Sequence, residues 1–281
     1  MNESEASALI ENIERKASRV VTVCGSGNMV WRRWGQGRPL VLLHGGAGGW
    51  MHWIKNIEHL SKTHAVWVPD MPGFGDSDLP SENDLDADTL APFVMKGAEE
   101  VTEGATFDLV GFSFGSLVAA AIAAEAPSNL AKLVLVSASG LGLFQGSPTM
   151  KSLRGVTDPL EKAEVLRFNL NAMMLHDPAS IDDLAILVQE KSARRDRVKN
   201  RKLARTDFIV EIASKWRCPV YGIWGRQDFA YRDQFSNLID VVGGLRLNET
   251  IVIEDAGHWL QFERPEEFNE ILTRVLSTQT A

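Results

Sequence analysis

Cysteine, basic charge and long apolar runs are all scarce in this sequence. The chain has two cysteines, Cys24 and Cys218, which lie far apart and outside any metal-binding spacing, so neither a disulfide framework nor a metal site is expected. Nowhere do about 18 apolar residues follow one another, which excludes a membrane-spanning helix. The stretch from residue 1 to 18 mixes charged and polar residues without an apolar core. We therefore expect no signal peptide and a cytoplasmic protein.

Acidic residues outnumber basic ones, 37 to 29 in 281 residues, which gives a formal net charge of −8. A protein of this charge lacks the basic surface that neutralises phosphates, so nucleic acid is not an expected partner. Hydrophobic residues make up 44% of the chain, enough for one large domain with a full core. We expect a small-molecule substrate, no membrane contact, and either a monomer or a homodimer.

Short apolar runs alternate with helical patterns along most of the chain. Continuous rather than alternating hydrophobicity predicts strands that are covered on both faces, as in a mainly parallel sheet. The expected strands are 39–44, 65–69, 107–111, 133–137, 220–224 and 250–253, after an antiparallel hairpin at 19–23 and 29–34. Helices are expected at 90–103, 116–125 and 266–276. The alternation predicts an α/β fold.

The pattern of apolar residues changes between residues 140 and 205. Strand-like runs vanish there and apolar residues recur at helical spacing, which predicts a helical insertion between two strands. The core domain would comprise residues 1–139 and 206–281, with the insertion at 140–205. Its basic run, 194–205, is expected to face solvent.

A serine lies between glycines where an expected strand meets an expected helix. The segment Gly111-Phe-Ser-Phe-Gly115 has the pattern of a serine on a sharp strand-to-helix turn, where only small neighbours let strand and helix approach closely. The first N–H groups of the helix would lie behind the serine, at the positive end of the helix dipole. Ser113 is therefore the predicted nucleophile, and the N–H of Phe114 is one predicted donor to the oxyanion.

A serine nucleophile needs a histidine base that is itself oriented by a carboxylate. In hydrolases with this type of turn, the acid and then the base follow the serine, each after a later strand. His258 follows the last expected strand and Asp228 follows the one before it, so they are the predicted base and acid. Asp233 and Asp255 are close in sequence to Asp228 and remain alternatives for the acid.

A glycine-rich loop, His44-Gly-Gly-Ala-Gly-Gly49, follows the expected strand at 39–44. In this type of hydrolase such a loop supplies the second oxyanion donor, which predicts that role for the N–H of Gly46. A dinucleotide loop with Asp70 on a ribose is the competing interpretation. It fails because Met51 stands where a small residue is needed. The predicted chemistry needs no metal and no organic cofactor.

Nearly the whole chain resembles the α/β-hydrolase superfamily. The similar segments are His44-Gly-Gly46, 70–77, the serine turn, Gly225-Arg-Gln-Asp228 and Gly257-His258. The resemblance implies the α/β-hydrolase fold, a mostly parallel central sheet flanked by helices, with residues 140–205 as a helical lid. Within the superfamily the chain is most similar to the meta-cleavage-product hydrolases, mainly through residues 257–269. Those enzymes cut carbon–carbon bonds in ring-fission products of aromatic catabolism.

Several positions depart from the pattern of that group. Phe112 and Phe114 flank the nucleophile where the group has Asn and Met, and His52 stands where it has another Asn. The lid arginine that would hold the substrate carboxylate falls on Gln189, and only Arg194 or Arg195, about one helical turn further on, could replace it. An apolar pocket is expected, lined by Trp50, His52, Phe112, Gln189 and Trp259 with the lid residues Phe144, Phe168, Met173 and Met174.

These observations predict a serine hydrolase that forms an acyl-enzyme from an ester, lactone or amide with an apolar or aromatic part. Because of the departures at Phe112 and Gln189, hydrolysis of a carbon–carbon bond in a vinylogous diketone ranks second. A ligand-binding receptor and a cofactor-free oxygenase or lyase use the same fold and are the alternatives from other classes.

Overall fold

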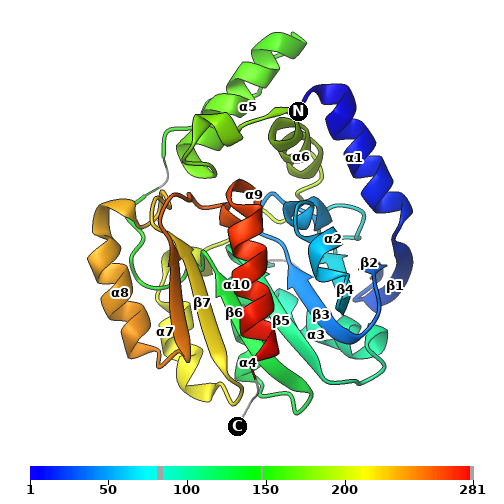
Figure 1. Ribbon diagram of the computed structural model, residues 1–281, viewed down its shortest axis with the longest axis vertical. Helices are drawn as coiled ribbons and strands as arrows, with labels where there is room; N and C mark the ends of the chain where they lie inside the picture. The colour runs from blue at the N-terminus through cyan, green and yellow to red at the C-terminus, as the bar shows by residue number, and fades with distance from the viewer. Residues whose placement is uncertain (81–84, 147, 279–281) are drawn as a thin grey trace.

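The computed structural model describes residues 1–80, 85–146 and 148–278. Its strands form one sheet in the order β1-β2-β4-β3-β5-β6-β7-β8 (Figure 1). The β1–β2 and β2–β4 pairs are antiparallel and the other five are parallel. The strands are β1 (Ser18–Cys24), β2 (Gly27–Trp34), β3 (Arg38–Leu43), β4 (His64–Asp70), β5 (Phe107–Phe112), β6 (Leu130–Val136), β7 (Val220–Gly225) and β8 (Glu249–Ile253).

Helices cover both faces of this sheet. They are α1 (Glu3–Arg15), α2 (Ile57–Leu60), α3 (Ala87–Val101), α4 (Phe114–Ala124), α5 (Pro159–Met173), α6 (Asp183–Ala193), α7 (Phe208–Ile212), α8 (Phe235–Gly244), α9 (Leu260–Glu263) and α10 (Pro265–Ser277). Short 3-10 helices are η1 (Trp50–Trp53), η2 (Pro178–Ser180), η3 (Leu203–Arg205), η4 (Ala213–Lys215) and η5 (Arg232–Gln234).

The core consists of two clusters of apolar side chains, one on each face of the sheet. Helices α3, α4, α7 and α8 contribute to the first cluster, and α1, α2, α6 and α10 contribute to the second. Strands β5 and β7 are buried at every position, as their mainly apolar sequences predict; the exception in β5 is Asp108, which pairs with Arg38 at 3.0 Å. The predicted architecture, a mostly parallel sheet flanked by helices, is confirmed.

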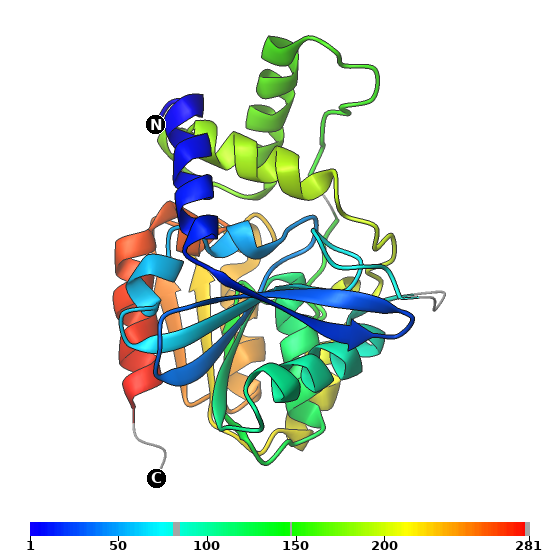
Figure 2. The same cartoon turned by 90° about the vertical axis from the view of Figure 1, so that its right-hand side faces the viewer.

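The region between β6 and β7 is helical, and its helices α5 and α6 lie beyond one end of the sheet, whereas α7 packs against α4 (Figures 1 and 2). The ends of this region meet, because the N–H of Gly140 donates to the carbonyl of Ala204 at 3.2 Å and the N–H of Gly142 donates to that of Thr206 at 2.9 Å. The predicted boundaries at residues 140 and 205 fall close to these bonds.

Helix α1 was not anticipated from the sequence. It begins at a capping box formed by Asn2 and Glu5, and it buries Ala6, Ile10 and Ile13. This spacing of apolar residues is helical, so the pattern was present in the sequence although the segment was considered only as a potential signal peptide. The helix contacts α6 (Figure 2). Within the described ranges, no helix is both long and apolar enough to cross a membrane.

Candidate active site

Ser113 occupies the turn between β5 and α4 with a backbone that few residues adopt. Its φ of 52° and ψ of −115° lie in a region that is strained for a residue with a Cβ. A Cβ on Gly111 would lie 2.4 Å from the carbonyl oxygen of Gly115, and one on Gly115 would lie 2.5 Å from that of His44. The two glycines are therefore required for the close approach of strand, helix and glycine-rich loop.

His258 and Asp228 reach Ser113 from the loops after β8 and β7. The Ser113 hydroxyl donates to His258 Nε2 at 2.8 Å, and His258 Nδ1 donates to Asp228 Oδ2 at 2.8 Å. Asp228 is fully buried and also accepts the N–H of Ala230 at 3.0 Å. The structure thus brings the three predicted residues into one hydrogen-bonded chain. The alternative acids Asp233 and Asp255 are not part of it.

The predicted oxyanion donors come from two elements that meet beside Ser113. Phe114 is the first residue of α4, where a helix N–H has no partner within the helix. Gly46 lies in the loop after β3, and both residues line the same cavity as Ser113. Among the described residues, no protein acceptor bonds to either N–H. Both groups are thus available to an oxygen atom in the cavity.

Two buried histidines hold the loop that contains Gly46. His44 Nδ1 donates to the carbonyl of Gly45 at 2.8 Å, and His44 Nε2 accepts the N–H of Met71 at 3.0 Å. His52 Nδ1 accepts the N–H of Gly45 at 3.2 Å. Burial lowers the pKa of His44 and holds that of His52 well below the usual 6.5. Both rings are therefore neutral, which leaves each one able to accept a backbone N–H.

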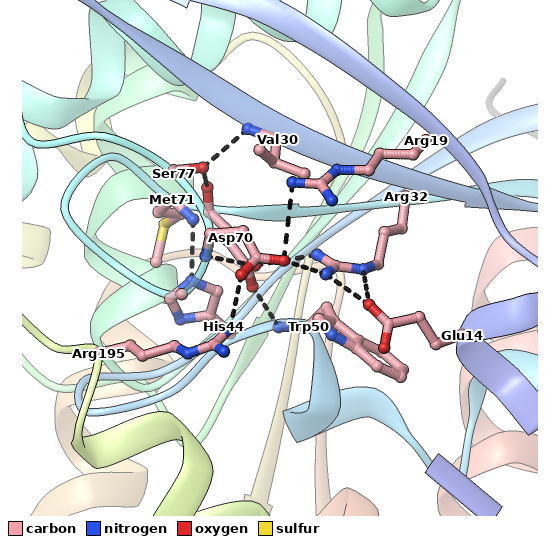
Figure 3. A network of polar contacts seen from close by, with 12 residues as sticks. Glu14, Arg19, Val30, Arg32, His44, Trp50, Asp70, Met71, Ser77 and Arg195 are labelled. Atoms are coloured by element: carbon pink, nitrogen blue, oxygen red, sulfur yellow. Dashed lines mark hydrogen bonds and ion pairs between the residues drawn. The ribbon is translucent and has the colours of Figure 1, made fainter. Parts of the chain in front are cut away.

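An ion network behind the loop fixes its far end (Figure 3). Asp70 accepts the N–H of Trp50 at 2.9 Å and bonds Arg32 at 2.9 Å. Arg32 also bonds Glu14 at 2.7 Å and Asp76 at 2.5 Å. Burial lowers the pKa of Arg32, but the three carboxylates outweigh it and the pKa stays above its ordinary value. The network joins α1, β2 and β4 to the glycine-rich loop.

A cavity of about 720 Å³ opens beside the Ser113–His258 pair. It lies at the carboxyl ends of the central strands, under α5. Its apolar walls include Phe112, Phe114, Phe144, Met173, Met174 and Phe229. Of these, all but Phe229 were expected from the sequence. The size and polarity suit a small molecule with an apolar part.

The other expected pocket residues lie outside this cavity. Trp50 stacks against Trp34 with ring centroids 5.6 Å apart, and Trp259 stacks on Phe262 at 4.1 Å. The indole N–H of Trp259 donates to the carbonyl of His52 at 2.9 Å. Trp50, His52 and Trp259 were expected to face substrate because they neighbour the loop and the base in sequence. The structure instead buries all three in the core behind the loop.

Two lid positions also differ from expectation. Gln189, on α6, is half-buried and is not among the cavity-lining residues. Phe168 is 40% exposed, with Lys151 Nζ 4.4 Å from its ring centroid. Position in a helix alone could not say which face meets the cavity, since α5 and α6 are each packed on more than one side.

The basic run in the insertion does not face solvent as a whole. Arg194 pairs with Glu190 at 3.0 Å and Arg195 pairs with Asp76 at 2.5 Å, both away from the cavity. Lys199, Arg201, Lys202 and Arg205 line the cavity itself. Sequence reasoning missed this group because a run of basic residues more often marks a solvated face.

No cluster of potential metal ligands occurs in the described ranges. The residues that meet at the cavity are a nucleophile, a base, an acid and two backbone donors. This set can attack a carbonyl carbon, accept and return a proton, and stabilise an oxyanion. Its donors match those of acyl transfer rather than of metal-assisted chemistry.

Comparisons with known proteins match this chain to alpha/beta hydrolases. The model of the alpha/beta hydrolase family matches residues 40–271. A Paraburkholderia phymatum protein named 2-hydroxy-6-oxononadienedioate/2-hydroxy-6-oxononatrienedioate hydrolase is 31% identical, over 95% of this chain and 98% of its own length. The 2-hydroxy-6-oxo-6-phenylhexa-2,4-dienoate hydrolase of Comamonas testosteroni is 28% identical, over 84% and 87%. The solved meta-cleavage product hydrolase of Pseudomonas fluorescens superposes with a TM-score of 0.75 at 24% identity, over 93% and 98%.

Proposed function

We propose a reaction for this chain, which belongs to the alpha/beta hydrolase family. It hydrolyses the carbon–carbon bond beside the ketone of a 2-hydroxy-6-oxo-dienoate. The hydrogen-bonded chain of Ser113, His258 and Asp228 on the cavity wall carries the proposal of a serine-dependent reaction. The names of the two relatives support this choice of bond. Sequence analysis ranked it second, and these relatives are the reason that it now ranks first.

In the proposed reaction, Ser113 attacks the ketone carbon while His258 takes its proton. Asp228 orients the imidazole and stabilises its charged form. The N–H groups of Gly46 and Phe114 bond the oxyanion, each contributing about 3 kcal/mol in sites of this kind. The buried, neutral His44 and His52 support the step indirectly, since they hold the loop that carries Gly46.

Cleavage then requires a carbon leaving group. Before the attack, the enol proton moves to the carbon next to the ketone, which gives the keto tautomer with a saturated carbon at the bond to be broken. When the tetrahedral adduct collapses, the electrons of that bond pass through the adjoining double bond to the oxygen on the carbon beside the carboxylate. The protonated His258 returns its proton to the oxygen of this dienolate, which becomes the hydroxydienoate, and the acyl group stays on Ser113. Water, activated by the same imidazole, then releases the acyl group as a carboxylic acid. The products are a hydroxydienoate and that acid.

We propose that residues 140–205 act as a lid over this reaction. Helix α5 supplies Met173 to the cavity wall, and Met174 follows directly at its end. The backbone bonds between Gly140 and Ala204 hold the two ends of the segment together at the edge of the core. Such an arrangement allows the segment to exclude water while the core stays rigid.

Hydrolysis of an ester, lactone or amide is the second candidate. It uses the same residues and needs no conjugated electron sink. One observation favours it: Gln189, on which the sequence resemblance places the lid arginine of the carbon–carbon hydrolases, does not line the cavity. The two candidates differ in the group that leaves, not in the nucleophile.

The test compares two substrates across three proteins. Wild type, Ser113→Ala and Ser139→Ala are assayed on 2-hydroxy-6-oxo-6-phenylhexa-2,4-dienoate and on p-nitrophenyl butyrate. Ser139 is the matched control, because it lines the same cavity without reaching His258. We expect Ser113→Ala to lower dienoate turnover by at least about a thousandfold, whereas Ser139→Ala keeps most of it.

Each other outcome has a distinct meaning. Serine-dependent ester hydrolysis with an untouched dienoate would select the second candidate. Turnover of either substrate that survives in Ser113→Ala would refute the assigned nucleophile. Oxygen uptake with the dienoate would instead indicate an oxygenase.

A further inference from the structure

Arg201 has a donor in the cavity wall that nothing in the described chain satisfies. Its Nη2 donates to Asp196, but its Nε is buried without a hydrogen-bond partner among the described residues. Burying such a group without a partner is costly. A bound ligand atom would therefore be stabilised there.

The position of this donor is close to the candidate oxyanion site. A Cβ added to Gly46 would lie 3.0 Å from Arg201 Nε. The guanidinium carbon lies 5.5 Å from the ring centroid of Phe114 and also 5.5 Å from that of Phe74. The guanidinium therefore lies beside both rings and against the loop that carries Gly46, one of the two predicted oxyanion donors.

The charge of the surrounding wall favours an anion. Besides His258, the charged residues that line the cavity in the described ranges are the basic Lys199, Arg201, Lys202, Arg205 and Arg232 and the acidic Asp233. Arg232 lies 3.9 Å from Asp233, and Arg205 lies over the ring of Phe144. This excess of positive charge occurs in a protein whose net charge is −8.

We propose that Arg201 is a specificity-determining residue that binds a carboxylate of the substrate in the cavity where Ser113 attacks the carbonyl. The inference rests on the proposed function, since it assigns the acid group of that substrate to a residue. It also explains how the cavity can select an acid although Gln189, Arg194 and Arg195 lie elsewhere. A guanidinium suits the role because its planar array of donors matches a carboxylate.

The experiment measures how strongly the protein prefers charged over neutral ester substrates. Neutral p-nitrophenyl alkanoates are compared with mono-p-nitrophenyl esters of dicarboxylic acids of matched length, from succinate to adipate. The ratio of kcat/KM for the charged over the neutral ester is determined for wild type, Arg201→Gln and Arg201→Lys. Arg194→Gln is the control, because it removes the same charge from the same segment at a site that is 68% exposed and outside the cavity.

We expect wild type to prefer a charged ester, and Arg201→Gln to lower that ratio by about tenfold to a hundredfold. The loss should appear mainly in KM, with the neutral ester nearly unaffected. Arg201→Lys should keep part of the preference, since it retains the charge without the planar donors. Arg194→Gln should match wild type. Thermal unfolding of each variant checks that it is folded, and Arg201→Lys serves if Arg201→Gln is not.

Two results would overturn the proposal. Equal losses for charged and neutral esters would mean that Arg201 shapes the loop or assists the oxyanion. A wild type without any preference for the charged esters would mean that the cavity does not select an acid. Both results are independent of carbon–carbon cleavage, because the ester pairs require only Ser113 and the cavity.

Discussion

Replacing Arg32 by methionine should destabilise the protein strongly, because it strands a buried carboxylate. The side chains of Arg32 and Asp70 are 3% and 2% exposed. Removing one partner of such a buried pair costs about 3–5 kcal/mol. The other two carboxylates of the network add little to this loss, because Glu14 is 48% exposed and Asp76 keeps its bond to Arg195. We expect the free energy of unfolding to fall by about 4 kcal/mol, mainly because the buried carboxylate of Asp70 loses its partner.

Urea unfolding followed by tryptophan fluorescence measures this loss, since the chain has eight tryptophans. The control is Lys16→Met, which breaks the ion pair with Glu58, whose partners are 53% and 54% exposed. That pair should contribute no more than about 1 kcal/mol. The double variant Arg32→Met with Asp70→Asn should recover part of the loss, because it removes the stranded charge. A loss no larger than that of Lys16→Met would refute the reasoning.

Three further predictions concern the site and its surroundings. Asp228→Asn should lower kcat on the preferred substrate by about 10⁴-fold, because His258 loses the carboxylate at Nδ1; circular dichroism checks that the fold is retained. In the wild-type protein, burial lowers the pKa of His52. Stability should therefore fall as the pH drops below 6.5, because His52 binds a proton in the unfolded chain but not in the folded one. His52→Asn should flatten this dependence in urea titrations, and parallel curves would contradict it. Gly75→Ala should lower the urea midpoint more than Gly104→Ala. Both positions have a positive φ, but only at Gly75 would the new Cβ lie 2.3 Å from the buried carboxylate of Asp70.

The strands and the triad residues could be predicted because each depends on a local pattern. A strand covered on both faces must be mainly apolar, so β5 and β7 can be recognised in the sequence although β5 includes Asp108. The turn at Ser113 needs small residues at fixed distances, and Gly111 and Gly115 supply them. Chain order then leaves few candidates for the base and the acid. Short-range constraints of this kind are fully present in the sequence.

The cavity wall could not be predicted, because it depends on how distant segments pack. Trp50 and Trp259 are adjacent to functional residues in sequence, but their rings turn into the core, where they bury more apolar surface. Arg201 is separated from Gly46 by more than half the chain, and only the return of the insertion to the core brings them together. Neither periodicity nor spacing encodes that contact.

Comparison of the buried Arg32 with the partly buried Arg201 shows how hydrogen-bond satisfaction separates a structural role from a binding role. Arg32 is surrounded by three carboxylates that use its donors, so no ligand could gain a bond there. Arg201 has one carboxylate partner and a buried Nε without one in the described chain. The two substitutions should therefore have opposite signatures. Arg32→Met should lower the free energy of unfolding without changing substrate preference. Arg201→Gln should cost less stability, since the side chain of Arg201 is 29% exposed, and it should remove the discrimination between charged and neutral substrates.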